Sequence, residues 1–446
     1  MKYSCRQTRL MAMNCEQVIE RCVELLNACY YGKKIGSKTD TLQPSHPGIV
    51  CVLKRMGIFQ PIQPYLDNGC NLMGNGKIRK TFFSMIAEHS VGRCQTGTPQ
   101  CHQCSLISFC QTGLSNHKYR KDNRPVAIDL FAGAGGLSAG FHYEGFRIAL
   151  AIERSRHAAQ TYRHNHPGVP VLEADARRVS AADILNITGL KPCSISVIMG
   201  GPPCQGYSAA GLRKPRREQN LLYQIVAKIA RGVKAPVLLM ENVPGLAKVG
   251  GVNFKTQILS FVANQGFNVK AVELDASKFG VPQRRKRLLF LGIHNRLNSN
   301  PQLLVPTQLK HTCSVVKAFK GLPSLIMDSG KDVAIHRGVV IYNHRAMVHS
   351  PEVVAKIQQI QPGNGPPSYR RLPVTLAQTI IAGHRALPVH PKQHRTITVR
   401  EAARLQTIPD KFRFLGPHAE QPLQVANAVP YNMARALGRA ALRVLK

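Results

Sequence analysis

Acidic residues are scarce in this chain of 446 residues, which has 23 Asp and Glu against 60 Lys and Arg and a net charge of +37. No apolar run approaches the roughly 18 residues that a membrane-spanning helix needs. The first residues, MKYSCRQTRLMAMNCEQ, also lack the apolar core of a secretory signal. We therefore expect a protein that stays inside the cell. Its partner should be a polyanion, with nucleic acid favoured over a membrane surface, because each basic side chain near a phosphate releases a counterion.

Cysteines are unevenly distributed along the chain. Ten of the 13 lie in the first 110 residues, and only Cys193, Cys204 and Cys313 follow. In a reducing compartment such thiols serve as metal ligands, nucleophiles or small buried side chains rather than as a disulfide framework. This shift in composition, together with the basic stretch Asn116–Arg124 and the Pro125 that closes it, predicts a domain boundary near residue 123.

Four cysteines of this first region are close together. Cys94, Cys101, Cys104 and Cys110 have the spacing C-x6-C-x2-C-x5-C, and four thiols within 17 residues favour a bound metal over core packing. Zinc sites favour paired C-x2-C knuckles, of which only one occurs here, so a 4Fe-4S cluster is preferred and zinc is the alternative. The spacing and the preceding segment His89–Cys94 resemble the iron–sulfur loop of endonuclease III-like DNA glycosylases. We expect a structural loop that presents basic residues to phosphates.

After residue 123, short apolar strands alternate with helical stretches, which predicts a parallel sheet wrapped by helices. The expected strands are Val126–Phe131, Ile148–Ile152, Ile195–Met199, Val237–Met240 and Leu288–Ile293. The first strand runs into the glycine turn Ala132–Gly136 and then a helix from about Leu137, as in nucleotide-binding α/β folds. Glu153 follows Gly133 by 20 residues, where such folds place an acid that binds a ribose. The turn suits a dinucleotide or S-adenosyl-methionine, but Ser138 replaces the third glycine of the phosphate fingerprint, so a pyrophosphate site is not indicated.

Two reactive side chains follow two of these strands. Cys204 lies in Gly200–Ser208, where two glycines and two prolines before it fix the backbone around one thiol. Open α/β sheets bind ligands at the carboxyl ends of their strands, so we interpret Cys204 as a nucleophile rather than a buried cysteine. Glu241 directly follows Val237–Met240 and would complete a nucleophile and acid pair, although such a Glu is also a common helix cap. The basic run Arg284–Arg287 leads straight into an apolar strand, which favours inward-facing arginines.

Six segments together resemble the conserved blocks of DNA (cytosine-5) methyltransferases, in the same order, over about residues 125–446. They are Asp129–Ser138, Gly201–Ser208, Glu241–Val243, Gln283–Arg287, Thr398–Gln406 and Gln424–Pro430. The resemblance implies a Rossmann-like α/β domain that binds S-adenosyl-methionine, with a small target recognition domain. We expect a Cys-rich, mainly helical region at 1–123, a catalytic domain at 124–292, target recognition at 293–394, and a segment at 395–446 that returns to the catalytic domain.

The family's reaction implies roles for the matching residues. Cys204 matches the nucleophile that adds to carbon 6 of a flipped-out cytosine, after which carbon 5 can attack the methyl group. Glu241 matches the group that protonates or hydrogen-bonds ring nitrogen 3, and Arg287 and Arg285 match basic positions that contact the base. Lys286 stands where the family usually has an acid, which predicts a more positive cluster.

For the cofactor, the resemblance places an aromatic ring against the adenosyl group, the glycine turn around the methionine portion, and acids near the ribose and the adenine amine. The matching positions are Phe131, Ala132, Gly133, Gly135, Gly136, Leu137, Glu153, Asp175, Pro203 and Asn427. Ala426 replaces the family's usual glycine, a change that would tighten this pocket.

Residues 293–394 hold 12 Lys and Arg but only 3 Asp and Glu, with 8 of the 17 His. In the family this interval reads the target sequence, and Gln358–Arg371 supplies side chains of the kind that contact base edges in the major groove. The histidines are expected to be phosphate-binding or structural groups rather than metal ligands. We expect this segment to contact duplex DNA, and the Cys-rich region to add a sequence-independent contact.

The leading hypothesis is a prokaryotic DNA (cytosine-5) methyltransferase that acts in the cytoplasm at the nucleoid, either in restriction–modification with a cognate restriction endonuclease or as an orphan. An RNA cytosine-5 methyltransferase on the same scaffold is an alternative, although Gln205–Ser208 is more similar to the DNA enzymes. A catalytically silent, metal-containing DNA-binding protein is a third hypothesis. The retention of Cys204, Glu241 and Arg287 argues against it.

Overall fold

The computed structural model describes residues 123–203, 221–247, 253–309, 312–323, 325, 333–336, 339–366, 369–381 and 387–445. The chain divides into two units, Met1–Asn123 and Arg124–Lys446, and the description below concerns the second. Cys204 and the four-cysteine cluster at 94–110 lie outside the described residues.

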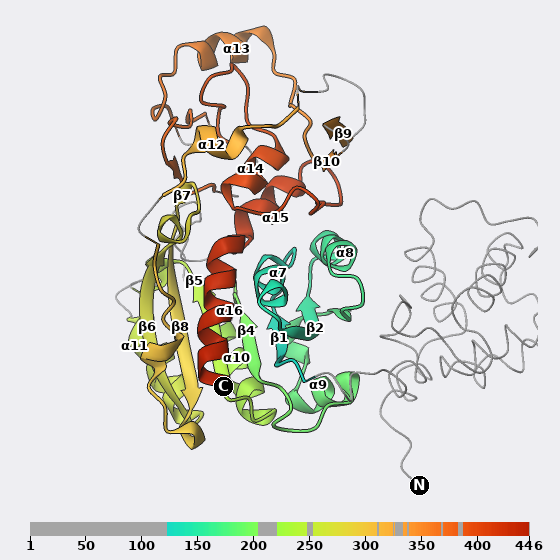
Figure 1. The fold of residues 1–446 in the computed structure, drawn as a ribbon, viewed down its shortest axis with the longest axis vertical. Helices are drawn as coiled ribbons and strands as arrows, with labels where there is room; N and C mark the ends of the chain where they lie inside the picture. Colours follow the sequence, from blue (N-terminus) through green and yellow to red (C-terminus); the bar gives the residue numbers. More distant parts are fainter. Residues whose placement is uncertain are drawn as a thin grey trace, which may run out of the picture. The chain divides into compact units, whose positions relative to one another are not determined.

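A seven-stranded mixed sheet forms the centre of the second unit (Figure 1). Its strands, in spatial order, are β3 (Val171–Glu173), β2 (Arg147–Glu153), β1 (Val126–Leu130), β4 (Val197–Gly200), β5 (Val237–Asn242), β8 (Lys286–His294) and β6 (Phe267–Asp275). The order reverses between β1 and β4. Open α/β sheets bind ligands at such a switch point, beyond the carboxyl ends of the strands.

The sequence predicts most of these strands correctly but is wrong about the direction of the last one. β8 runs antiparallel to both β5 and β6, where the pattern predicts a parallel strand. The segment 276–285 that joins β6 to β8 is shorter than the crossover that parallel neighbours require, so the two strands form a hairpin. β6 and β3 are additional strands. β6 alternates buried and exposed positions and therefore lacks a continuous apolar run.

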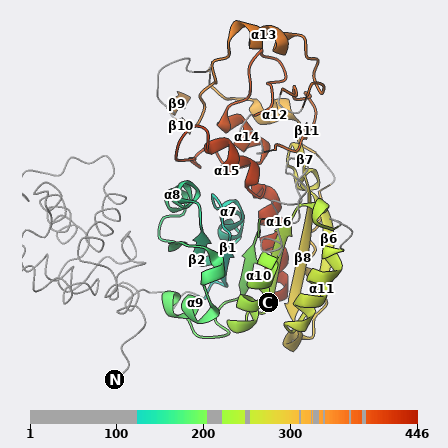
Figure 2. The ribbon, with the colours of Figure 1, turned by 180° about the vertical axis from the view of Figure 1, so that it is seen from behind.

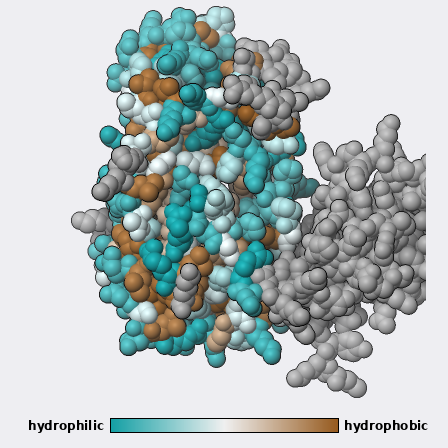
Figure 3. Space-filling view, viewed as in Figure 1, coloured by the Kyte–Doolittle hydropathy of each residue, from teal (hydrophilic) through white to brown (hydrophobic). Residues whose placement is uncertain are grey.

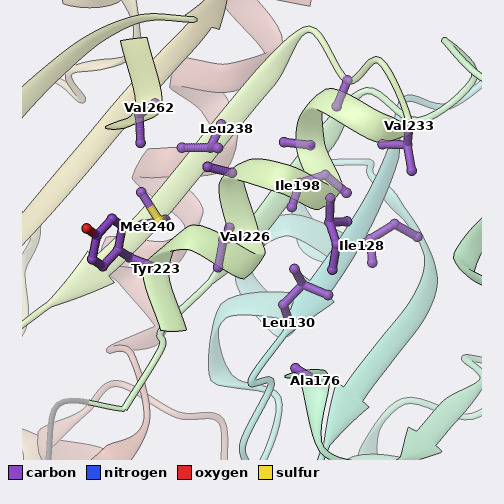
Figure 4. Close-up of a cluster of buried hydrophobic side chains, with 14 of the residues drawn as sticks. Ile128, Leu130, Ala176, Ile198, Tyr223, Val226, Val233, Leu238, Met240 and Val262 are labelled. Carbon is purple, nitrogen blue, oxygen red and sulfur yellow. The ribbon is translucent and has the colours of Figure 1, made fainter. Parts of the chain in front are cut away.

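Helices cover both faces of the sheet (Figures 1 and 2). On one face lie α7 (Gly136–Tyr143), α8 (Arg156–Asn165) and α16 (Tyr431–Leu445), and on the other α9 (Ala181–Thr188), α10 (Leu222–Gly232) and α11 (Phe254–Asn264). In the core between the sheet and the second group of helices, Ile198 of β4 and Leu238 of β5 pack with Val226 of α10 (Figure 4). Because both faces are covered, the central strands are continuous apolar runs, which is why the sequence reveals them.

The C-terminal part of the chain packs back against the sheet-containing part of the second unit. α14 (Val399–Leu405) begins at a capping box in which Thr398 and Glu401 exchange hydrogen bonds. α15 (Gln421–Asn427) follows, and α16 then packs along α7. The two helices approach closely at Gly140, where a Cβ would lie 2.4 Å from the Cβ of Ala434.

Residues 293–394 contain short elements joined by long irregular segments. They are α12 (Val315–Phe319), β9 (Val333–His336), β10 (Val339–Tyr342), α13 (Pro351–Gln358) and β11 (Ala377–Gln378), and β11 pairs with β7 (Gln283–Arg284). Arg371, at the end of the predicted base-reading stretch, is buried and donates hydrogen bonds to the main-chain oxygens of Ile357, Ile360 and His390. This arginine satisfies main-chain carbonyls inside the protein, so part of the basic excess of this region is structural.

Histidines of this region also serve the structure. His344 is buried and its Nδ1 lies 2.9 Å from Thr398 Oγ1. Burial lowers the pKa of His390 to about 4, so it is neutral at physiological pH. Among the described residues, no group of three or more His, Cys, Asp and Glu could hold a metal ion.

The surface is mixed in polarity. In the face drawn in Figure 3, hydrophilic side chains cover most of the part around α13, with apolar groups between them. In the described part of the chain, no helix has the length and apolar character needed to cross a bilayer.

Candidate active site

One cavity of about 510 Å³ lies at the carboxyl ends of β1, β2, β4 and β5 and is closed on one side by the end of α15. The predicted cofactor residues that the structure describes line it, except Gly135, and so do Glu241, Arg285 and Arg287. Segments that are far apart in the sequence therefore form a single site, at the place that the sheet order indicates.

The glycine turn is held by the acid at the end of β2. Glu153 Oε2 accepts a hydrogen bond from Gly133 N at 2.8 Å, and Glu153 Oε1 accepts one from Ser155 N at 2.6 Å. Phe131 and Gly133 adopt positive φ angles of 57° and 56°, so the backbone of Phe131 is strained, and Phe131 lines the cavity. Because a carboxylate has about four acceptor sites, Glu153 keeps capacity for a ligand beyond these two bonds.

Gly135 packs against a buried histidine. Its φ is 93°, and a Cβ there would lie 2.4 Å from His166 Nε2. Its carbonyl oxygen is 3.1 Å from the same nitrogen, on the α8 side of the turn. Gly135 is therefore needed for packing against a buried histidine, and it is not part of the cavity wall.

A buried chain of hydrogen bonds lies under the glycine turn, and the sequence motifs do not predict it. Tyr162 donates to Ser138 Oγ at 2.6 Å, and Ser138 donates to Asp129 Oδ2 at 2.7 Å. Asp129 is only 1% exposed, and its burial raises the pKa of the carboxyl to about 7. The signal in the sequence is an acid within an otherwise apolar strand.

Asp175 also lines the cavity, just after β3, and is already paired. Its carboxylate accepts hydrogen bonds from both the main chain and the guanidinium of Arg177, with an ion pair of 2.6 Å. The hydrogen bonds to Arg177 lower the pKa of Asp175 to about 2, so this acid is ionised at physiological pH.

Glu241 and Arg287 form an ion pair at the other end of the cavity. Arg287 Nε lies 2.6 Å from Glu241 Oε1, and both side chains are about one-tenth exposed. Glu241 Oε2 faces Gly201, at the start of the segment that leads to Cys204. Asn242 Nδ2 donates to Pro202 O at 3.1 Å and so fixes that segment against β5.

Side chains alternate in direction along the predicted basic cluster. Gln283, Arg285 and Arg287 are buried, whereas Arg284 and Lys286 are exposed. Lys286 points away from the cavity and pairs with Glu273 of β6 at 3.0 Å. The extra positive charge that Lys286 brings to the basic cluster therefore lies outside the cavity, because successive residues of a strand face opposite sides.

Arg285 does not pair with an acid. Its Nη2 donates to the main-chain oxygens of Ala426 and Ala428, while its Nε and Nη1 are buried and have no partner among the described residues. Burial lowers the pKa of Arg285 well below its usual value.

Fold and site together define an α/β enzyme with a cofactor cavity at the sheet edge and an acid–arginine pair beside it. Residues 126–443 match the model of the C-5 cytosine-specific DNA methylases, and the chain belongs to that family. Cys204, which lies within the matched range, follows the segment that Asn242 fixes.

Individual relatives agree with the family. Type II methyltransferase M1.HphI of Haemophilus parahaemolyticus is 32% identical over 337 residues, which cover 71% of this chain and 86% of that protein. Type II methyltransferase M.DdeI of Desulfomicrobium norvegicum is 29% identical over 369 residues, covering 70% and 86%. A solved structure of a prophage-encoded protein of Escherichia coli, described as a DNA modification methyltransferase, has a TM-score of 0.61 at 26% identity and covers 72% of this chain and 99% of that one.

Proposed function

We propose that this chain transfers a methyl group from S-adenosyl-methionine to carbon 5 of a cytosine flipped out of duplex DNA, and that it serves in bacterial restriction–modification. One observation carries the proposal. A single cavity of about 510 Å³ joins the glycine turn and Glu153 with the Glu241–Arg287 pair, so that a methyl donor and a base can lie side by side.

The residues around the cavity suit this cofactor. S-adenosyl-methionine supplies an electrophilic methyl group on a positively charged sulfur. Glu153 and Asp175 place two carboxylates on the cavity wall, and Phe131 offers a ring for the adenosyl group. Asn427 is exposed toward the cavity at the end of α15. The remaining acceptor sites of Glu153 suit ribose hydroxyl groups.

At the base end, the proposal assigns one role to each side chain. The Cys204 thiolate forms a bond to carbon 6 of the cytosine, and the ring electrons then attack the methyl carbon from carbon 5, which breaks the bond from that carbon to sulfur and releases S-adenosyl-homocysteine. A base then removes the proton on carbon 5, and the bond between Cys204 and carbon 6 breaks to restore the ring and the thiolate. Glu241 Oε2 faces the Gly201 segment. In its protonated form this oxygen donates a hydrogen bond to ring nitrogen 3, while Arg287 holds Oε1 and orients the carboxyl group. Arg287 also stabilises the negative charge that develops on the ring.

Transfer of tritium from labelled S-adenosyl-methionine tests the proposal. Wild-type protein should label unmethylated duplex DNA, and Cys204→Ala should label none. The same assay with RNA decides the alternative substrate, which the DNA methyltransferase relatives do not favour. Failure of the wild-type protein to label DNA would refute the proposed activity. Bisulfite sequencing of DNA from an expressing host then identifies the recognition site.

The role in restriction–modification rests on the Type II methyltransferases among the relatives. It implies a cognate endonuclease and action in the prokaryotic cytoplasm, at the nucleoid. DNA methylated by this protein should resist cleavage by an extract of the source cells that cuts unmethylated DNA. Equal cleavage of both DNAs would leave the protein as an orphan methylase.

Residues 293–394, which are rich in basic side chains, are proposed to read the target sequence of the DNA.

A separate proposal concerns Cys94, Cys101, Cys104 and Cys110, which are outside the described residues. Their spacing supports a 4Fe-4S cluster that stabilises a DNA-contacting loop. The protein purified without oxygen should show an absorbance band near 400 nm, roughly where such clusters absorb, and Cys101→Ala should remove it. A colourless protein that contains zinc would support the alternative metal.

A further inference from the structure

Arg285 connects two distant parts of the chain. Its main-chain N donates to Asp275 Oδ1 at 3.2 Å, and its carbonyl oxygen accepts from Ala276 N at 2.9 Å, so its backbone is fixed to the β6–β8 hairpin. The side chain reaches α15, where Nη2 lies 2.7 Å from Ala426 O and 3.2 Å from Ala428 O.

These two carbonyl groups flank Asn427, the predicted cofactor contact. α15 ends at Asn427, and the last carbonyls of a helix have no partner within the helix. A cation at a helix C-terminus is favourable, because the carbonyl dipoles point toward it. Arg285 therefore fixes the backbone on both sides of the one residue of this turn that is exposed toward the cavity.

The hydrogen bonds of the Arg285 side chain lead to the α15 turn. Both N–H groups of Nη2 are used by the two carbonyls, whereas Nε and Nη1 are buried and have no partner among the described residues. Arg287, in contrast, is about one-tenth exposed and pairs with Glu241. Of the two neighbouring arginines, Arg287 is therefore the one that the described contacts join to Glu241.

We propose that Arg285 is a positioning residue for the methyl donor, which it serves by holding Asn427. The inference rests on the proposed function insofar as Asn427 contacts S-adenosyl-methionine. Under this proposal, two arginines that are two residues apart serve the two ends of the cavity. Arg285 acts at the cofactor end and Arg287 at the base end.

The experiment measures binding of S-adenosyl-homocysteine to the full chain without DNA, by calorimetry. Arg285→Met removes the donors and keeps most of the volume, and we expect it to weaken binding about tenfold, the effect of losing hydrogen bonds to two carbonyls. Arg285→Lys restores a charged donor near the Nη2 position and should recover most of the affinity. The exposed neighbour provides the matched control, and Arg284→Met should bind like wild type.

A double-mutant cycle shows whether Arg285 acts through Asn427. In an Asn427→Ala background, Arg285→Met should cause little further loss of affinity, because its effect requires the Asn427 side chain. In tritium transfer, Arg285→Met should raise KM for S-adenosyl-methionine about tenfold and leave KM for DNA unchanged. Arg287→Met should show the opposite pattern.

Two results would overturn the inference. One is unchanged binding of S-adenosyl-homocysteine by Arg285→Met together with a raised KM for DNA, which would return Arg285 to the base. The other is full additivity with Asn427→Ala. If wild-type protein binds S-adenosyl-homocysteine but methylates no DNA, the proposed function fails, whereas the binding results still decide the role of Arg285.

Hydrogen exchange in the wild-type chain decides the case if Arg285→Met does not fold. S-adenosyl-homocysteine alone should slow exchange both in the peptide that contains Asn427 and in the peptide that covers residues 283–287. Protection confined to the Asn427 peptide would contradict the inference, because the two segments would then respond independently.

Discussion

The buried carboxyl group of Asp129 should make folding stability depend on pH. Burial raises its pKa from the usual 3.8 to about 7 in the folded chain. Between these values the folded protein holds a proton that the unfolded chain has released. The free energy of unfolding therefore falls as the pH rises from about 4 to about 7, and stays low above that range. Since one pKa unit corresponds to about 1.4 kcal/mol, the loss is at most roughly 4 kcal/mol.

Asp129→Asn removes this titration and preserves the size of the side chain. Ser138 can still donate to the amide oxygen, as it donates to the carboxyl in the wild-type chain. We expect the variant to gain about 1–4 kcal/mol relative to wild type between pH 5 and pH 8, because only the wild-type chain must bury a charge at the higher pH. Other titrating groups are common to both proteins and cancel in the difference.

Urea unfolding at pH 5 and pH 8, followed by far-ultraviolet circular dichroism because the chain has no Trp, measures this difference. Ser138→Ala is the second variant. It removes the hydrogen bond that lowers the pKa of Asp129, so the pKa of Asp129 in the folded variant should rise further. The fall in the free energy of unfolding with rising pH should then continue to a higher pH than in the wild-type chain. Identical pH dependence of wild type and Asp129→Asn would refute the reasoning, since it would mean that the folded chain carries Asp129 ionised at both pH values.

Three further substitutions test other parts of the structure. Arg287→Met should leave Glu241 without its cation and lower kcat by about 100-fold, measured by tritium transfer, while binding of S-adenosyl-homocysteine is unchanged. Gly140→Ala should cost about 1–3 kcal/mol in urea unfolding, because its Cβ would clash with α16, and a smaller loss would mean that the helices can separate. Lys286→Glu, which introduces the acid usual in the family, should change kcat less than twofold, because Lys286 faces Glu273 outside the cavity; a large change would refute its outward orientation.

Burial explains which parts of the fold the sequence predicts. β1, β4 and β5 are covered on both faces and are visible as apolar runs. β6 alternates in exposure and is not visible in the same way. The antiparallel direction of β8 follows from the length of its connection to β6, which the pattern of strands alone does not reveal.

In the site too, residues that belong to short motifs can be predicted from the sequence, whereas contacts between residues far apart in the chain cannot. Glu241 and Arg287 are found from their motifs, and the structure brings them within 2.6 Å although 46 positions separate them in the chain. The partners of Arg285 depend on where the chain returns more than 140 residues later, and no local pattern carries that information. The proton on Asp129 depends on burial beneath the glycine turn, which is likewise a property of the folded chain.

The charge that a basic motif brings to a site depends on which of its side chains face that site. Arg284–Arg287 is a run of four basic residues, yet only Arg285 and Arg287 face the cavity, because side chains alternate along a strand. Gln283, the next inward position, accepts a hydrogen bond from Ile380 N and donates one to Leu405 O. These three inward positions thus contact four different segments of the chain. A substitution at an outward position of the run should therefore affect activity far less than its change in charge suggests.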